Sequence, residues 1–85
     1  MNLQLIQGEF NSKEALDIIT QMIHVKIKFH EDKINRSSNE EDIKMREDRI
    51  KKLQRDLYQL RQLVQSKHKK VHLESVIEVS EGVPA

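Results

Sequence analysis

Cysteine and tryptophan are absent from this chain of 85 residues, and proline occurs only once. Without cysteine, disulfides and thiolate chemistry are excluded, and with them the small secreted proteins that depend on disulfides for stability. Aromatic residues make up only 4% of the sequence, so little bulk is present to line a deep pocket. A chain of this length forms one small domain, and we do not expect an ordinary enzyme.

Long apolar runs are missing as well. No segment approaches the roughly 18 uninterrupted apolar residues that a membrane span needs. The opening string MNLQLIQGE lacks the basic start of a signal peptide, and glutamines interrupt its apolar residues. We therefore expect a soluble, cytoplasmic protein without a membrane partner.

Helix breakers are confined to the two ends of the chain. The glycines are Gly8 and Gly82, and the proline is the second-last residue, so residues 9–81 contain neither type. Asn11 followed three residues later by Glu14 is typical of a capping box at the start of a helix. The expected elements are a helix over about 12–35, a turn over 36–39 and a second helix over about 40–69.

Both flanks alternate apolar with polar residues, which is typical of half-buried strands. The expected strands cover about residues 2–7 and 71–79, and residues 81–85 are expected to form a flexible tail. The sequence thus predicts an α+β fold, mostly α, in which residues 1–80 form a single domain of order β-α-α-β. Because the second helix brings the chain back, the strands are expected to run antiparallel, paired within one chain or between two.

Each expected helix carries an apolar stripe at spacings of three and four residues, which places the stripe on one face. When the helices fold back about Ser37 and Ser38, the numbers of facing residues sum to 76 or 77 in every layer. Two stripes that share one register over five layers predict an antiparallel, coiled-coil-like helical hairpin. The predicted seam comprises Leu16, Ile19, Ile23, Ile27 and Ile34 in the first helix and Ile43, Ile50, Leu53, Leu57 and Leu60 in the second.

The same register places His30 opposite Arg46 as a polar layer within the apolar seam. One interpretation is that this layer fixes the alignment of the helices, at some cost in stability. A second is a pH-sensitive joint, because a histidine that faces a guanidinium loses its proton more readily. A third is that Arg46 extends outward and His30 meets water near the turn.

The first helix has a second apolar stripe, roughly 120° around its axis from the seam. Its members are Ala15, Ile18, Met22, Val25 and Phe29. The expected strands are shorter than this helix, so Val25 and Phe29, nearest the turn, should lack cover in a monomer. The stripe predicts a homodimer or higher homo-oligomer, in which the first helices pack together or the strands join into a four-stranded sheet. The alternative is that the strands fold back over the whole stripe.

Residues suited to chemistry are scattered along the chain. His24 and His30 are six residues apart on one helix, so they point some 120° apart and cannot chelate one ion. The isolated glycines exclude a glycine-rich phosphate loop. The serines and the threonine lie in cap, turn, helix or strand contexts that lack the sharp elbow of a nucleophile. We predict no catalytic residue, no metal site, no cofactor and no enzymatic activity.

The net charge of +1 is unevenly distributed. Residues 44–70 carry ten basic and three acidic side chains, whereas the segments before and after each have a net charge of −3. Basic side chains along the second helix can neutralise phosphates, although acidic residues interrupt them and aromatic residues for stacking are scarce. The candidate polyanion contacts are Arg49, Lys52, Arg55, Lys67, Lys69 and Lys70.

Three segments carry a resemblance to known proteins: LIQGEF at residues 5–10, Glu14 with Ala15, and KIKFH at residues 26–30. Over mainly the first 35 residues, the chain resembles small uncharacterised bacterial proteins in which a short strand leads into a helical hairpin. The resemblance implies this architecture and a bacterial cytoplasmic setting, but no activity and no site residue.

From the second stripe, we expect a non-enzymatic protein–protein interaction or assembly module that self-associates through the first helix. The alternative is a nucleic-acid-associated accessory protein that uses the basic second helix.

Overall fold

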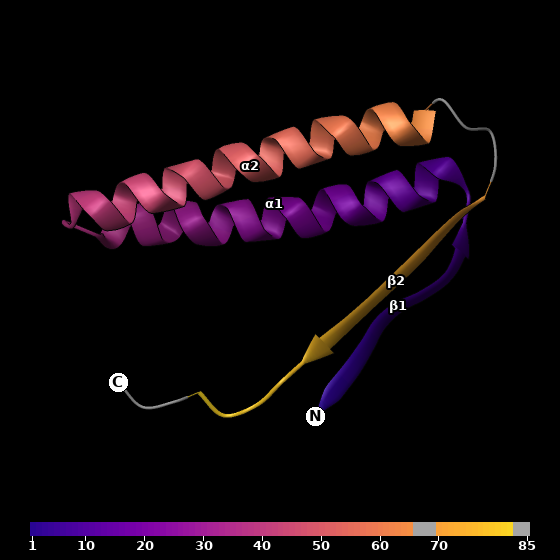
Figure 1. Cartoon of the computed structure of the whole chain (residues 1–85), viewed down its shortest axis with the longest axis horizontal. Coiled ribbons are helices and arrows are strands. Elements are labelled where there is room, and N and C mark those ends of the chain that lie inside the picture. Colours follow the sequence, from indigo (N-terminus) through magenta and orange to yellow (C-terminus); the bar gives the residue numbers. More distant parts are fainter. Residues whose placement is uncertain (66–69, 83–85) are drawn as a thin grey trace.

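The computed structural model describes residues 1–65 and 70–82. Its elements, in chain order, are β1 (Asn2–Phe10), α1 (Ser12–Arg36), α2 (Glu40–Gln65) and β2 (Val71–Glu78) (Figure 1). The predicted order of strand, helix, helix and strand is confirmed. The predicted end of the second helix, at about residue 69, and the last part of the predicted tail lie outside the described residues.

α1 begins with the capping box that the sequence predicts. The side-chain oxygen of Asn11 accepts a hydrogen bond from the backbone N–H of Glu14 at 2.8 Å, and the Glu14 carboxylate accepts one from the N–H of Asn11 at 3.2 Å. These bonds satisfy backbone donors that the start of a helix leaves unpaired. At the other end, the N–H of Ser37 donates to the carbonyl oxygen of Ile34, so α1 includes Arg36, one residue beyond the predicted boundary.

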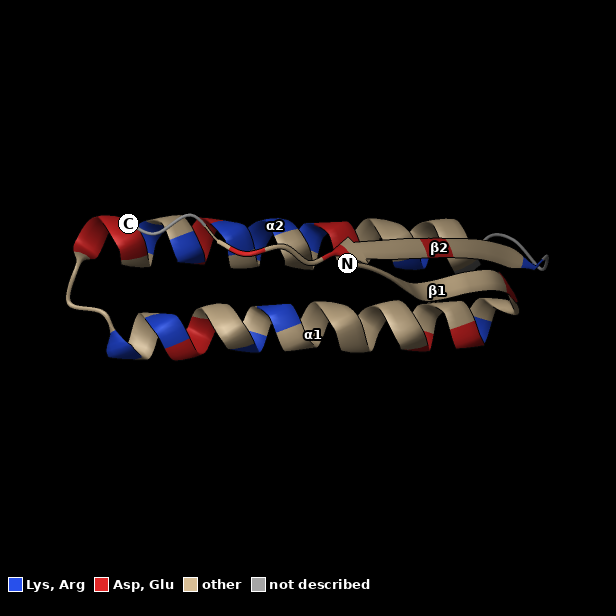
Figure 2. Cartoon of the chain, turned by 90° about the horizontal axis from the view of Figure 1, so that it is seen from below, with Lys and Arg blue, Asp and Glu red and all other residues tan. Residues whose placement is uncertain are grey.

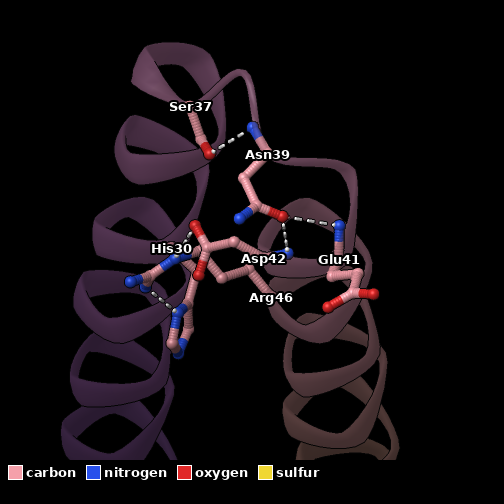
Figure 3. A network of polar contacts seen from close by, with 6 residues as sticks. All are labelled: His30, Ser37, Asn39, Glu41, Asp42 and Arg46. Carbon is pink, nitrogen blue, oxygen red and sulfur yellow. Dashed lines mark hydrogen bonds and ion pairs between the residues drawn. The ribbon is translucent and has the colours of Figure 1, made fainter.

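Polar side chains hold the turn between the helices (Figure 3). The side-chain oxygen of Asn39 caps α2 by accepting hydrogen bonds from the N–H groups of Glu41 at 2.9 Å and Asp42 at 3.2 Å. Ser37 Oγ accepts a hydrogen bond from the N–H of Asn39 at 3.1 Å. Because one helix ends and the next is capped within three residues, the turn covers residues 37–39 and is shorter than the predicted 36–39.

α1 and α2 lie side by side and run in opposite directions (Figures 1 and 2). Every residue of the predicted seam is half-buried or buried, with Leu57 the least exposed among them, and Val64 beyond the seam is buried too. His30 contacts Arg46 at 3.1 Å, and their numbers sum to 76, as the predicted register requires. The antiparallel hairpin is thus the central unit of the fold.

β1 and β2 form an antiparallel two-stranded ribbon within the chain. The prediction that β1 ends near residue 7 is wrong, because Gly8 pairs with Leu73 and Phe10 pairs with Val71. This pairing extends the strand almost to the first residue of α1. β2 ends one residue earlier than predicted.

A β-bulge keeps apolar side chains on one face of the ribbon. Pairing is regular from Phe10 to Ile6, skips Leu5, and resumes at Gln4. Residues directly opposite each other share a face, and faces alternate along a strand. What we call the inner face therefore consists of Leu3, Ile6, Gly8 and Phe10 from β1 and Val71, Leu73, Ser75 and Ile77 from β2. It is half-buried near the helices but exposed at Leu3 and Ile77.

The ribbon leaves one end of the hairpin at an angle and diverges from α1 (Figure 1). The molecule is consequently flat and open, with extents of 46 × 31 × 13 Å and a radius of gyration of 15.8 Å, against roughly 12 Å for a compact domain of this length. Among the described residues, the buried apolar side chains are Ala15, Leu57 and Val64. All three belong to the half of the hairpin nearest the strands.

Candidate functional site

The second apolar stripe of α1 becomes exposed toward the turn. Ala15 is 0% exposed and Ile18 is half-buried, whereas the exposed fractions are 38% for Met22, 71% for Val25 and 53% for Phe29. The prediction that Ala15 lies in an oligomer interface is wrong, because this small side chain sits in the first turn of α1, where its own chain covers it. Val25 and Phe29 lack cover, as the lengths of the strands predict.

The exposure follows from the divergence of the ribbon from α1. A cavity of about 440 Å³ lies between β1 and α1, and a second of about 290 Å³ lies between the inner face of the ribbon and the hairpin. We call the two cavities together the apolar cleft. Its apolar lining comprises Leu5, Ile6, Ile18, Ile19, Met22, Ile23, Val25, Leu53 and Leu73. The alternative in which the strands cover the whole stripe is therefore wrong.

The basic side chains of α2 form an exposed row over the middle of the helix (Figure 2). Arg49, Lys52 and Arg55 are all exposed and border one shallow depression, but acidic side chains, among them Asp48, border it too. Lys52 also forms an ion pair with Asp56 at 3.1 Å. Lys70 is exposed at the start of β2, and the predicted contacts Lys67 and Lys69 lie outside the described residues. The row is thus a mixed surface with a local excess of positive charge.

The predicted polar layer lies inside the hairpin, close to the turn (Figure 3). His30 is 4% exposed, and its Nδ1 lies 3.1 Å from Nη1 of Arg46. Arg46 in turn donates from Nε to the carboxylate of Asp42 at 3.3 Å. The interpretation in which His30 meets water is therefore wrong. The roles in alignment and in pH sensing stay predictions.

The surroundings of His30 disfavour its charged form. Burial lowers the pKa of His30 below 6.5, because the imidazolium loses its hydration, and the positive charges of Arg46, Arg49 and Lys26 lower this pKa further. The neutral ring can accept a hydrogen bond at only one nitrogen. Since Arg46 can only donate, that acceptor is Nδ1, and the ring proton lies on Nε2.

Other features of the described chain offer little chemistry. Over residues 1–65 and 70–82, no three His, Asp or Glu side chains gather closely enough to hold a metal ion. His72 lies 4.0 Å from Glu74 on the exposed ribbon. As far as the structure describes them, neither helix has an apolar stretch of the length that crossing a bilayer requires.

Sequence reasoning missed one cluster, in which Lys26, His30 and Arg49 border a common cavity between the helices. The sequence held a signal for this cluster, because Lys26 precedes His30 by one helical turn and Arg49 follows Arg46 by about one.

Comparison of the chain with protein-family models, curated proteins and solved structures yields no match.

Proposed function

We propose that this protein is a non-enzymatic assembly module that forms a homodimer through the apolar cleft and the exposed part of the α1 stripe. The occupant of the cleft is a second copy of the chain. A cytoplasmic setting, which the lack of cysteine favours, belongs to the same proposal.

The accessible surface of the single chain carries the proposal. This surface is 7229 Å², whereas a compact monomer of 10.1 kDa exposes roughly 5,300 Å². The excess of about 1,900 Å² falls within the roughly 1,000–2,500 Å² that each partner buries in the larger protein–protein interfaces. A second copy of the chain can therefore bring the exposed surface to the value typical of a folded protein.

The apolar surface has a shape that suits pairing with itself. Each copy offers an exposed part at Phe29 and a hollow part, the apolar cleft, which Met22 and the exposed Val25 help to line. A two-fold axis lets the exposed part of each copy enter the hollow part of the other, so both contacts form at once. Leu3 and Ile77 extend the apolar surface along the open end of the ribbon.

The ribbon offers a second route to the same assembly. In a two-stranded sheet, each strand has one edge whose N–H and C=O groups have no strand partner. Pairing of such edges across a two-fold axis would give the four-stranded sheet that the sequence suggests, and it is compatible with contacts through α1.

The exposed stripe provides the test. Val25→Asp places a carboxylate at a position that is 71% exposed in the monomer, so the hairpin should fold while the dimer dissociates. We expect the dimer dissociation constant to rise about 30-fold or more, measured by sedimentation at a series of protein concentrations. Tyr58→Asp is the matched control, because Tyr58 is exposed on α2 and borders neither cavity of the cleft.

The unmodified protein should have a mass near twice 10.1 kDa at high concentration. A mass of one chain at every concentration would contradict the proposal. Loss of helix in Val25→Asp at equal dilution would also contradict it, because the stripe would then be monomer core.

A nucleic-acid-associated role remains the second candidate, supported by the exposed row of Arg49, Lys52 and Arg55. Binding of this kind weakens steeply between about 50 and 200 mM salt, since released counterions drive it. Titration of a duplex and of a single strand at both salt concentrations would test the candidate. Absence of binding at the lower concentration removes it.

A further inference from the structure

A further cavity, separate from the apolar cleft, lies between the two helices. It is further from the turn than the contact between His30 and Arg46. Its volume is about 230 Å³, and we call it the basic pocket. Its lining comprises Lys26 and His30 from α1 and Arg49, Lys52 and Leu53 from α2. No acidic residue is among these lining residues, in contrast to the exposed depression on α2.

His30 gives this pocket a buried hydrogen-bond donor without an acceptor. With Nδ1 occupied by Arg46, the ring proton lies on Nε2. Nε2 is buried and has no hydrogen-bond partner among the described residues. In Figure 3, this nitrogen points away from the turn, toward the level of the hairpin at which the pocket lies. Since an unpaired buried donor destabilises a protein, an acceptor atom placed here would be bound favourably.

Lys26 and Arg49 give the pocket a positive potential from both helices. Within the described part of the chain, neither forms an ion pair with a carboxylate. Lys52 adds a third cation, although Asp56 partly neutralises it. This positive potential acts on His30, because the charges of Lys26 and Arg49 both lower the pKa of its imidazole.

We propose that the basic pocket binds a phosphate group, with Nε2–H of His30 as the buried donor and Lys26 and Arg49 as the charged contacts. The lining brings possible donors from both helices, Lys26 and His30 from α1 and Arg49 from α2, and a tetrahedral oxyanion offers acceptors in several directions. A planar carboxylate offers only two oxygens. A metal cation does not fit, because Lys26, Arg49 and Lys52 line the pocket with positive charge and no carboxylate is among its lining residues.

Binding requires no covalent step and no change in the protonation of His30, because the neutral ring already presents its donor. Two kinds of molecule offer the same phosphate chemistry: a small phosphorylated compound and the backbone of a nucleic acid. The experiment therefore uses two probes, inorganic pyrophosphate and a short oligothymidylate, each titrated into the full chain by calorimetry.

His30→Leu is the central variant, because it removes the donor and keeps the hairpin interior apolar. We expect the dissociation constant of the bound probe to rise about tenfold or more. The matched control is His24→Leu, which removes an exposed histidine from the same helix and should leave binding unchanged. Arg49→Gln should weaken binding similarly, whereas Arg61→Gln, at an exposed arginine of α2 outside the pocket, should not.

A direct readout is the nitrogen-15 resonance of His30 Nε2, which should shift when the probe binds. Pyrophosphate binding that depends on His30 identifies a small phosphorylated ligand. Oligothymidylate binding that depends on His30, with weak pyrophosphate binding, identifies a nucleic acid backbone. Binding that His30→Leu leaves unchanged overturns the proposal, as does the absence of binding by both probes. If His30→Leu fails to fold, the comparison of Arg49→Gln with Arg61→Gln decides the question alone.

Discussion

The two ends of the hairpin are built from the same repeat but are buried differently. At the strand end, Ala15 and Val64 are buried beside the root of the ribbon. At the turn end, seam residues such as Ile34 and Ile43 are only half-buried, and the buried residue is the polar His30. Two helices alone cannot enclose the residues between them, because each covers only one side of the other. Among the described residues, buried apolar side chains are found in the half where the ribbon adds a third element.

The largest effect on stability is expected when a seam side chain is shortened to alanine at each end of the hairpin. Leu57→Ala, in the buried half, should lower the free energy of unfolding by about 2–4 kcal/mol, and Ile34→Ala, at the half-buried turn end, by about half as much. Urea unfolding at one fixed protein concentration measures both. Equal losses would mean that the turn end is covered in solution, for example by a second copy.

A smaller loss of stability is expected from a substitution in the ribbon, at Gly8. Gly8 has a φ of 147°, a conformation that residues with a Cβ rarely adopt, and no atom lies within 4 Å of where its Cβ would be. Gly8→Ala should therefore cost about 1–2 kcal/mol through backbone strain alone. Gly82→Ala, in open space without a positive φ, is the control and should change stability by less than about 0.5 kcal/mol. A neutral Gly8→Ala would show that the strand relaxes at this position.

The smallest expected effect concerns pH and belongs to the turn end. The pKa of His30 is lower in the folded chain than its ordinary value of 6.5, because of burial and the charges of Arg46 and Arg49 on α2 and Lys26 on α1. Well above pH 6.5 this residue is neutral in both the folded and the unfolded state, so its protonation does not affect stability. As the pH falls below 6.5, the unfolded state takes up the proton first and stability declines until the folded pKa is reached.

The pH effect is measured as the difference between the unmodified chain and His30→Leu in unfolding free energy across that range. His30→Leu should lack this part of the decline, while His24→Leu should retain it. Identical pH profiles for the unmodified chain and His30→Leu would contradict the prediction. They would place the imidazole in water, as in the third sequence interpretation.

The hairpin could be predicted because its determinants are local and periodic. The spacing of isoleucines and leucines set the facing surfaces, and the absence of glycine and proline permitted two long helices. Opposition of His30 and Arg46 followed from the same register, and the structure places them 3.1 Å apart. The capping box at Asn11 could also be read from residues three positions apart.

The remaining features depend on contacts between distant segments. The end of β1 was underestimated because Phe10 is in a strand only through its pairing with Val71. The angle of the ribbon, and with it the burial of Ala15, has no local signature in the sequence. The basic pocket was missed because Lys26 and Arg49 belong to different helices, and no motif links them.

The bulge at Leu5 has a consequence for how the strand tolerates changes in length. The bulge places Leu3 on the same face as Ile6, which an uninterrupted strand would not do. If Leu5 were deleted, Leu3 and Ile6 would be two residues apart in a regular strand, and both would still lie on the inner face. A deletion within the regular part of β1 would instead invert the facing of every residue on one side of it. Tolerance to shortening is therefore concentrated at a single position of this strand.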